Sequence, residues 1–343
     1  MTDASVILSV AVFNDLLWSL EQKSGEIVMN SMKRLSHIFE SSVRLPIDDS
    51  SRLIIMSDCH RGDGSQADDF FKNENLYISA LNHYFEQEFT YIEVGDGDEL
   101  WENKRMSDII YAHQSVFELL KKFYEKERVY FVYGNHDMVK QSDKFLKSNL
   151  YEYYDKRENK TVSLFENMRA YEGLVLEYKS WGLSPFSKEI LLVHGHQVDD
   201  LNSSLWKLSR FLVRYVWRPL ELFGVNNPTS PAQNQEKKEI VGNRLTEWVV
   251  KENHMLIGGH NHRPMFPDMG EPLYFNDGSC VHPQLITGIE IDRGEISLVK
   301  WSVKVKQEGS LYVGRDVIAG PKKLRDFFMT KRIFETCTLK DLG

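Results

Sequence analysis

Short apolar runs that end in polar clusters recur along the chain, and longer amphipathic stretches separate them. Runs of this length are typical of buried strands, and stretches such as residues 109–124 repeat their apolar side chains at helical spacing. Strands that alternate with helices predict an α/β fold with a layered core. The polar clusters occur at five places: residues 57–60, 95–96, 134–137, 194–196 and 258–262.

Two terminal segments flank this alternating region. Residues 1–50 place Met32, Leu35 and Phe39 at near-helical spacing, which predicts a helical N-terminal extension. After the fifth cluster the pattern becomes rich in strands, and it predicts a second sheet that the C-terminal half completes. The chain then ends in a basic segment with helical spacing. We therefore expect an extension over 1–50, a central domain over 51–305 and a tail over 306–343.

One stretch, residues 200–250, interrupts the alternation between the fourth and fifth clusters. Its apolar spacing predicts two helices, over residues 205–218 and 236–250. The sequence between them contains Pro228 and Pro231, which indicate a loop. We interpret this stretch as a helical insertion within the central domain that lies beside the clusters, in the manner of a lid.

The composition narrows the class of protein. The chain of 343 residues has 42 Lys and Arg against 50 Asp and Glu, a formal net charge of −8. This argues against a nucleic-acid partner, because nucleic-acid binders usually have a basic surface. Three widely spaced cysteines form neither a disulfide framework nor a paired-cysteine zinc motif. No apolar run reaches the roughly 18 residues of a membrane span, and the apolar residues 6–13 follow no basic leader, so we expect a cytoplasmic protein.

The five clusters contain residue types that bind metal ions. Side chains at the carboxyl ends of strands in an open α/β sheet meet in one crevice, although they are far apart in the sequence. Aspartate, histidine and asparagine suit divalent ions such as Mn²⁺, Fe²⁺ or Zn²⁺. Glycines within the clusters, such as Gly95 and Gly195, allow the backbone to turn sharply where a ligand must project. We interpret Cys59 as a small buried spacer and not as a ligand.

The order of these motifs resembles that of the calcineurin-like metallophosphoesterases, over roughly residues 52–302. The resemblance implies a sandwich of two mixed β-sheets flanked by helices, here with a helical insertion. It also implies hydrolysis of a phosphoester or pyrophosphate bond by a hydroxide that two metal ions activate. The matching motifs are Asp58-x-His60, Gly95-Asp96, Gly134-Asn135-His136-Asp137, His194-Gly195-His196 and Gly259-His260-Asn261-His262.

The same resemblance implies a role for each motif residue. Asp96 would bridge two divalent ions, with Mn²⁺ as the first choice and Fe or Zn as alternatives. His136 would stabilise charge on the phosphate and protonate the leaving oxygen, with Asp137 either orienting its ring or acting only as a helix N-cap. Of His194 and His196, the first is the expected ligand. The remaining ligands would be Asp58, His60 and His262 for one ion, and Asn135, His194 and His260 for the other.

Finer matches are similar to one branch of the family, the UDP-2,3-diacylglucosamine hydrolases. Glu99 and Trp101 follow Asp96 as they do in that branch, and Arg263 with a proline follows the last histidine motif. The insertion lies where that branch has a lid over acyl chains. His136 departs from the branch, which typically has arginine there, and this leaves monoesters and diesters open as substrates.

A basic stripe on the predicted helix 205–218 suits an anionic, amphiphilic ligand, because apolar and aromatic side chains occupy much of the remaining surface. It would bind a phosphate head group, or an anionic membrane surface in a peripheral contact; a solvated face of an ordinary helix is the alternative. Arg61 and Asn135 are further candidates for substrate contact, and a surface role is the alternative for Arg61. The stripe consists of Lys207, Arg210, Arg214 and Arg218.

Three functional hypotheses follow from these patterns. The first is a dinuclear phosphohydrolase whose substrate is a small or lipid-linked phosphate or a nucleoside diphosphate compound. The second is a cyclic-nucleotide phosphodiesterase or nuclease, against which the acidic balance argues. The third is a catalytically silent metal-binding scaffold, against which the complete ligand set and His136 argue. The exact substrate, the native metal pair and the oligomeric state stay open.

Overall fold

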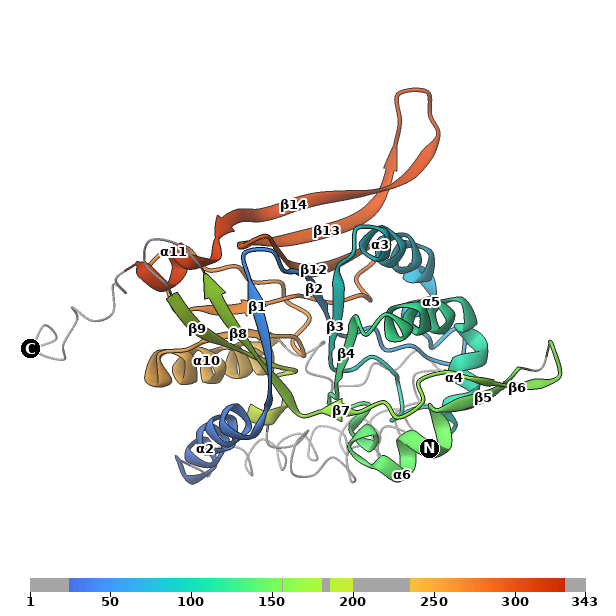
Figure 1. Cartoon of the computed structure of the whole chain (residues 1–343), viewed down its shortest axis with the longest axis horizontal. Coiled ribbons are helices and arrows are strands. Elements are labelled where there is room, and N and C mark those ends of the chain that lie inside the picture. Colours follow the sequence, from blue (N-terminus) through green and yellow to red (C-terminus); the bar gives the residue numbers. More distant parts are fainter. Residues whose placement is uncertain (1–24, 156, 181–185, 200–234, 331–343) are drawn as a thin grey trace, which may run out of the picture.

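The structure is a computed structural model, and it describes residues 25–155, 157–180, 186–199 and 235–330. The predicted helix 205–218, with Arg210 and Arg214, lies outside the described residues. Strands from both halves of the chain form two large mixed sheets with helices around them (Figure 1). This arrangement confirms the predicted α/β sandwich.

The seven-stranded sheet contains the strands that precede the first three polar clusters. Its members are β2 (Arg52–Met56), β3 (Thr90–Val94), β4 (Val129–Val132), β7 (Ala170–Tyr171), β12 (Leu285–Asp292), β13 (Glu295–Val305) and β14 (Leu311–Lys323). The order across the sheet is β14-β13-β12-β2-β3-β4-β7. β2, β3, β4 and β7 run parallel to one another, while β12, β13 and β14 pair antiparallel with their neighbours.

The five-stranded sheet contains the strands that precede the last two clusters. Its members are β1 (Val43–Asp48), β8 (Gly173–Ser180), β9 (Phe186–Val193), β10 (Met255–Gly258) and β11 (Tyr274–Asn276). They lie in the order β1-β8-β9-β10-β11, and only the β8–β9 pair is antiparallel. A separate small hairpin of β5 (Glu152–Asp155) and β6 (Lys160–Ser163) projects from the domain (Figure 1).

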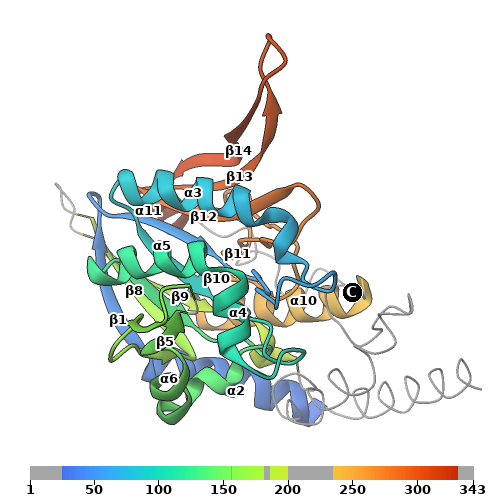
Figure 2. The ribbon, with the colours of Figure 1, turned by 90° about the vertical axis from the view of Figure 1, so that its right-hand side faces the viewer.

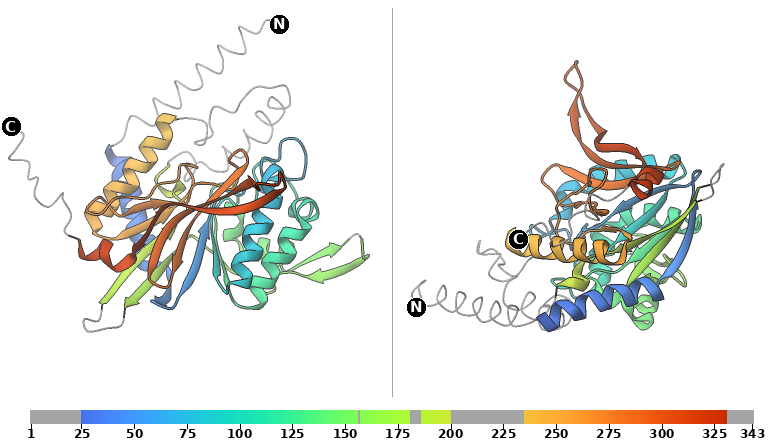
Figure 3. Two further views of the ribbon diagram at one scale, coloured as in Figure 1. Left: turned by 90° about the horizontal axis from the view of Figure 1, so that it is seen from above. Right: turned by 90° about the vertical axis from the view of Figure 1, so that its left-hand side faces the viewer.

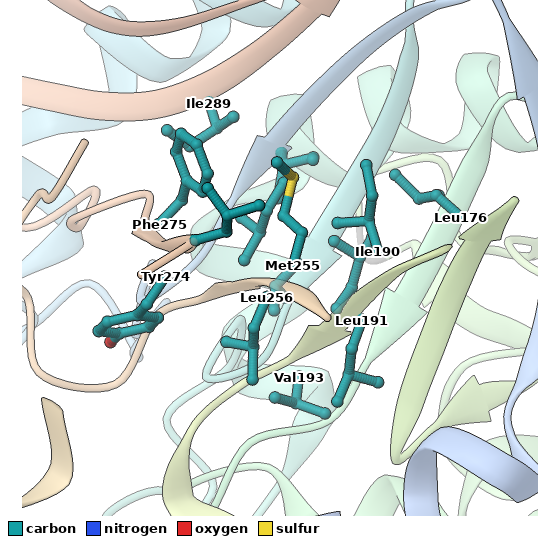
Figure 4. Close-up of a cluster of buried hydrophobic side chains, with 14 of the residues drawn as sticks. Leu176, Ile190, Leu191, Val193, Met255, Leu256, Tyr274, Phe275 and Ile289 are labelled. Carbon is teal, nitrogen blue, oxygen red and sulfur yellow. The ribbon is translucent and has the colours of Figure 1, made fainter. Parts of the chain in front are cut away.

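Alternation along the strands divides the interior into two cores. In β2, Leu53 and Ile55 face the core that is shared with the five-stranded sheet, whereas Ile54 and Met56 face the core under the helices on the other side. This is the two-residue period of a strand that is buried on both faces. Figure 4 shows part of the shared core, where side chains of β8, β9, β10 and β11 pack together.

Helices cover the outer faces of both sheets. α3 and α5 pack beside the seven-stranded sheet in the second core, and α2 and α10 pack on the five-stranded sheet (Figure 2). The helices are α2 (Gly25–Ser41), α3 (Glu74–Glu86), α4 (Met106–Ala112), α5 (Gln114–Glu125), α6 (Asp143–Asn149), α10 (Gln235–Glu252) and α11 (Leu324–Met329). Within the described residues, the short 3₁₀ helices are η1 (Phe70–Asn73), η2 (Met138–Gln141) and η3 (His196–Val198). None of the helices in the described ranges is long and apolar enough to cross a lipid bilayer.

Several predicted elements differ from the structure. The C-terminal strands do not form a second sheet of their own: β12 pairs with β2 and so extends the first sheet, and only β11 joins the other. The predicted single helix over 109–124 is interrupted at His113, which lies buried between Asp68 and Glu74.

The two predicted terminal segments also contain strands that belong to the sheets. Within the extension, residues 43–48 form β1, which pairs in parallel with β8. Within the tail, residues 311–323 form β14, and with β13 it makes a long two-stranded arm that extends beyond the sheet (Figure 3). The second predicted insertion helix is confirmed as α10, with Val241, Leu245 and Trp248 buried. The domain boundaries themselves stay predictions.

Candidate metal centre

The predicted ligand residues lie just beyond the carboxyl ends of five strands, where the two sheets meet. The seven-stranded sheet provides Asp58, His60, Asp96 and Asn135, and the five-stranded sheet provides His194, His260 and His262. We expected the strand ends to converge on one crevice, and the resemblance implied that two sheets form the domain. The structure brings the ends of strands from both sheets together, because β9 and β10 pack on the core that they share with β2 and β3.

A first group of donor atoms comes from Asp58, His60 and His262, whose ligand atoms all lie within 4.8 Å of one another. His262 Nε2 lies 3.0 Å from Asp58 Oδ1, and the Nε2 atoms of His60 and His262 are 3.3 Å apart. Two ring nitrogens this close repel each other unless a proton or a cation lies between them. The side chains of both histidines are 13% exposed, so this group opens to solvent.

A second group comes from Asp96, His194 and His260, all buried, and again the ligand atoms lie within 4.8 Å of one another. His194 Nε2 is 3.0 Å from Asp96 Oδ2 and 3.2 Å from His260 Nδ1. The same oxygen of Asp96 also lies 3.8 Å from His60 Nε2 of the first group. A single carboxylate oxygen thus faces both groups, which is the position that the bridging role of Asp96 requires.

Two buried polar side chains in the site have atoms without hydrogen bonds. Asn135 is fully buried, and neither its Oδ1 nor its Nδ2 has a partner; Asp58 Oδ1 has no hydrogen bond of good geometry, although His262 Nε2 lies 3.0 Å from it. A buried polar group without a partner costs about 1–3 kcal/mol. A metal ion bound by these oxygens would remove that cost. The residues therefore fit two divalent ions, as the resemblance implied.

The backbone of the ligand residues is held in an uncommon conformation. Asp58, His60, Asp96, His260 and His262 all have positive φ, between 47° and 70°. This left-handed conformation costs roughly 1–2 kcal/mol per non-glycine residue, and such strain clusters at functional sites. We expected the cluster glycines to provide the turns, but in most cases the ligands themselves turn.

Several cluster glycines provide close approach instead. A Cβ on Gly134 would lie 2.1 Å from Asp96 Oδ1, and a Cβ on Gly259 would lie 2.1 Å from Ser57 Oγ. Both glycines are thus in contact with the loops that carry the carboxylates. Gly95 and Gly195 match the expectation, because their φ values of 87° and 115° are accessible mainly to glycine.

The electrostatics of the site keep its carboxylates ionised. Burial alone would raise the pKa of Asp58 and Asp96, but nearby histidines outweigh burial and hold both pKa values well below the usual range. Burial would likewise lower the pKa of His194, but the carboxylates of Asp96 and Asp58 raise it to about 9. Protons on the histidines thus balance the carboxylate charges, and a divalent cation can replace them.

His136 lies beside the first group and is oriented by Glu99. Its Nδ1 is 2.7 Å from a Glu99 oxygen, and its ring stacks on Trp101 with centroids 4.3 Å apart. Glu99 also contacts His60 Nδ1 at 2.9 Å. Burial raises the pKa of Glu99, but the charges of His136 and His60 outweigh burial and lower it to about 2. One ionised carboxylate therefore fixes both rings.

The prediction that Asp137 orients the His136 ring is wrong. The Asp137 carboxylate accepts hydrogen bonds from the backbone of Gly134 at 2.7 Å and of Gly97 at 3.1 Å, and from Lys140 at 2.7 Å. It also makes no capping hydrogen bond at the start of η2. Asp137 follows His136 directly in the sequence, but the backbone turn points the two side chains in different directions.

Arg61 is neither a surface residue nor placed to contact substrate. It is 1% exposed and makes bonds of 2.7 and 2.9 Å to Glu93 and of 2.8 Å to Asp98. Both predicted roles are therefore corrected: the side chain next to His60 points into the interior and not toward the mouth of the site.

The structure favours His194 over His196 as a ligand. His194 Nδ1 donates to the carbonyl of Val94 at 2.9 Å, which leaves Nε2 directed at Asp96. His196 is buried with both ring nitrogens unpartnered, and its pKa is held well below the usual value by burial and by the charge of His194. It belongs to none of the donor groups that the described residues form.

Sequence reasoning missed two residues that support the site. Asp199 Oδ2 lies 3.3 Å from His260 Nε2, the ring nitrogen that faces away from the second group. Metal-binding histidines commonly have a carboxylate partner in this position, and the acidic residue soon after the His194 motif was the available signal. Lys140 contacts both Asp137 and Asp98 at 2.7 Å, and no local pattern singles it out.

One of three comparisons with known proteins, the scan against family models, agrees with this geometry. A family model described as calcineurin-like phosphoesterase matches residues 51–264, well over half of the chain. The curated proteins contain no match. Among solved structures, Vps29 from Chaetomium thermophilum is 9% identical with a TM-score of 0.34, covering 79% of this chain and 96% of that one. Vps29 in complex with the RaPID-derived cyclic peptide RT-D3 is 10% identical with a TM-score of 0.31, covering 78% and 96%. Structural likeness of this degree carries no argument about function.

Proposed function

The chain belongs to the calcineurin-like phosphoesterase family, and from that premise we propose that it is a dinuclear metal-dependent phosphohydrolase that cleaves a phosphoester or pyrophosphate bond. The observation that carries the proposal is the position of Asp96 between the donor groups: one of its oxygens lies 3.0 Å from His194 Nε2 and 3.8 Å from His60 Nε2, and Asp96 also forms a donor group with His60 and His136. Asp58, His60 and His262 would hold one ion. Asn135, His194 and His260 would hold the other, with Asp96 common to both.

Two divalent ions bound there would make water a stronger nucleophile at neutral pH and neutralise charge on the phosphate. The chain's own residues provide the remaining chemistry. With Nδ1 of His136 held by Glu99, Nε2 is the ring nitrogen that can deliver a proton to the leaving oxygen. The carboxylate of Glu99 stabilises the doubly protonated ring that this step requires. Trp101 packs on one face of the ring and limits its rotation.

For the substrate, we propose a small or lipid-linked phosphate, including nucleoside diphosphate compounds of the UDP-2,3-diacylglucosamine type. The exposed edge of the first donor group supports access by a substrate, because His60, His262 and His136 are the site histidines with exposed side chains of 13–15%. The motif with Glu99 and Trp101 supports the same substrate class.

The test is metal-restored hydrolysis by purified, metal-stripped protein. The panel contains p-nitrophenyl phosphate, bis-p-nitrophenyl phosphate, a cyclic nucleotide and a UDP-sugar with and without acyl chains, each with Mn²⁺, Fe²⁺ or Zn²⁺. We expect Asp96→Asn to reduce kcat by more than about 100-fold, beyond the roughly 10–100-fold typical of residues that only support a ligand. Glu99→Gln should fall within that smaller range while two ions per chain remain bound.

Asp316→Asn is the matched control, because Asp316 is a carboxylate of β14 that pairs with Lys304 far along the sheet from the site. It should hydrolyse at the wild-type rate. If the wild-type protein binds two ions but cleaves none of these substrates, the chain is a metal-binding module and the proposal is wrong.

A further inference from the structure

Five charged side chains form a buried ion network beneath the candidate metal centre. Arg61, Glu93, Asp98, Asp137 and Lys140 are each at most 3% exposed. Arg61 binds Glu93 and Asp98, and Lys140 binds Asp98 and Asp137 at 2.7 Å each while lying 3.9 Å from Glu93. Each cation therefore connects its own segment of the chain to the segment of residues 93–98.

The ion network links the three loops of the seven-stranded sheet that carry ligands. Arg61 follows the ligand His60, Asp98 lies two residues after Asp96, and Asp137 lies two residues after Asn135. The backbone takes part as well: Asp137 accepts from Gly97 and Gly134, and the backbone of His136 donates to Asp96 Oδ1 at 2.8 Å.

Side chains of the network also lie in close contact with the backbone of Gly97, between Asp96 and Asp98. A Cβ on Gly97 would lie 2.0 Å from Glu93 Oε1 and 2.6 Å from Arg61 Nη2. Only a residue without a side chain fits there. A shift of the network would consequently move the peptide that directly follows the bridging carboxylate.

Stability alone does not account for this arrangement. Buried ion pairs lose hydration that their mutual attraction barely repays, and apolar replacements of similar volume are often neutral or stabilising. The network contains three carboxylates for two cations, and backbone N–H groups of Gly97 and Gly134 also donate to one of the carboxylates, Asp137.

We propose that Lys140 is a positioning residue for the metal centre: by joining Asp137 to Asp98 it fixes the loops of Asp96 and Asn135 in their ligand geometry before metal binds. This inference rests on the proposed function for its catalytic consequence, but its main prediction concerns metal binding and needs no substrate.

The experiment compares three variants of the full chain. Lys140→Met removes the cation at nearly constant volume. Asp137→Asn keeps the shape and leaves two cations with two carboxylates, so it keeps the test valid if Lys140→Met fails to fold. The amide introduced by Asp137→Asn cannot accept from Gly134, Gly97 and Lys140 together, because its nitrogen only donates. Arg315→Met is the control, since Arg315 pairs with the buried Glu290 in the same sheet but away from the ligand loops.

The readouts are the Mn²⁺ affinity by calorimetry, the visible absorption spectrum of the Co²⁺-loaded protein and the melting temperature of the metal-free protein. We expect Lys140→Met and Asp137→Asn to lower metal affinity about 10–100-fold and to alter the Co²⁺ spectrum. Arg315→Met should lower the melting temperature alone. For substrates that turn over, kcat should fall with KM unchanged.

The inference is overturned if both network variants lose melting temperature as Arg315→Met does but keep wild-type Mn²⁺ affinity and an unchanged Co²⁺ spectrum. Failure of the proposed function has a different signature. In that case the wild-type protein binds metal and hydrolyses nothing, while the network variants still differ from the control in metal affinity.

Discussion

The two sheets support their ligand loops in different ways. Under the loops of Asp96 and Asn135 lies the buried ion network, in which charged groups meet charged groups. Under the loops of His194 and His260 lie apolar side chains: Val193 and Ile257 are fully buried, and Leu245 of α10 approaches Gly195. The metal centre is thus built between an ionic half and an apolar half.

The difference matches the chemistry of the ligands on each side. The ionic half holds both carboxylate ligands and the amide, whose loops must be fixed against mutual repulsion before a cation arrives. The ligands of the apolar half are histidines, which can be neutral. Apolar packing is sufficient to place these rings, because the second ring nitrogen of His194 bonds to a backbone carbonyl and that of His260 lies beside a carboxylate. The comparison predicts that the two halves respond differently to changes of charge.

The largest effect is expected from removing a cation of the ionic half. Arg61→Met leaves the buried carboxylates of Glu93 and Asp98 with Lys140 as the nearby cation of the network. Breaking a buried ion pair in this way costs about 3–5 kcal/mol. Urea denaturation of the metal-free variant measures that loss, and calorimetry should show weaker Mn²⁺ binding as well. A loss below about 1 kcal/mol, the usual value of an exposed pair, would contradict the idea that the network stabilises these loops.

A change of pH should have an intermediate effect on the stability of the metal-free protein, mainly through His194 of the apolar half. In the metal-free protein the pKa of His194 is raised to about 9 by Asp96 and Asp58 against the effect of burial, whereas an unfolded histidine has a pKa of about 6.5. The stabilising contribution of the protonated ring is therefore fully present below pH 6.5 and is lost as pH rises through 9. His60, whose pKa is also raised, acts with the same sign.

Metal binding must displace the proton from His194 Nε2, so affinity for Mn²⁺ should rise by up to roughly tenfold per pH unit below pH 9. Melting temperatures measured from pH 6 to 9.5 should fall for the metal-free protein and stay more nearly constant for the loaded one. His196 and His262 do not obscure this trend, because their pKa values are lowered and they stay neutral in this range. A flat metal-free profile would show that His194 carries no extra proton.

The ligand set could be predicted from sequence because each ligand follows a short apolar run. That pattern places Asp58, Asp96 and His194 at strand ends, and the structure brings these residues together. The pattern does not say which sheet a strand joins. A strand that is buried on both faces has the same apolar sequence pattern in either sheet. The antiparallel pairing of β12 with β2 could therefore not be predicted.

The groups that support the ligands were harder to predict, because adjacency in sequence does not fix where a side chain points. Arg61 is next to His60, yet it turns inward to Glu93. Asp137 is next to His136, yet the ring is held by Glu99, which lies 37 residues earlier. Tertiary packing determines such partners, and the local pattern of a single sequence does not show which residues tertiary packing brings together.

The smallest effect is expected from an ion pair in the five-stranded sheet. Arg44 of β1 lies 3.1 Å from Glu189 and 3.8 Å from Glu177, with its side chain 35% exposed. Water and salt screen such a pair, and its removal typically costs about 0–1 kcal/mol. Arg44→Ala should therefore lower the free energy of unfolding by no more than about 1 kcal/mol and leave the Mn²⁺ affinity unchanged. Arg44 and Arg61 each pair with two carboxylates, so the two positions differ mainly in burial and in distance from the ligand loops. If Arg44→Ala weakened metal binding as much as Arg61→Met does, the support of the centre would be spread over both sheets, and the division into an ionic and an apolar half would not hold.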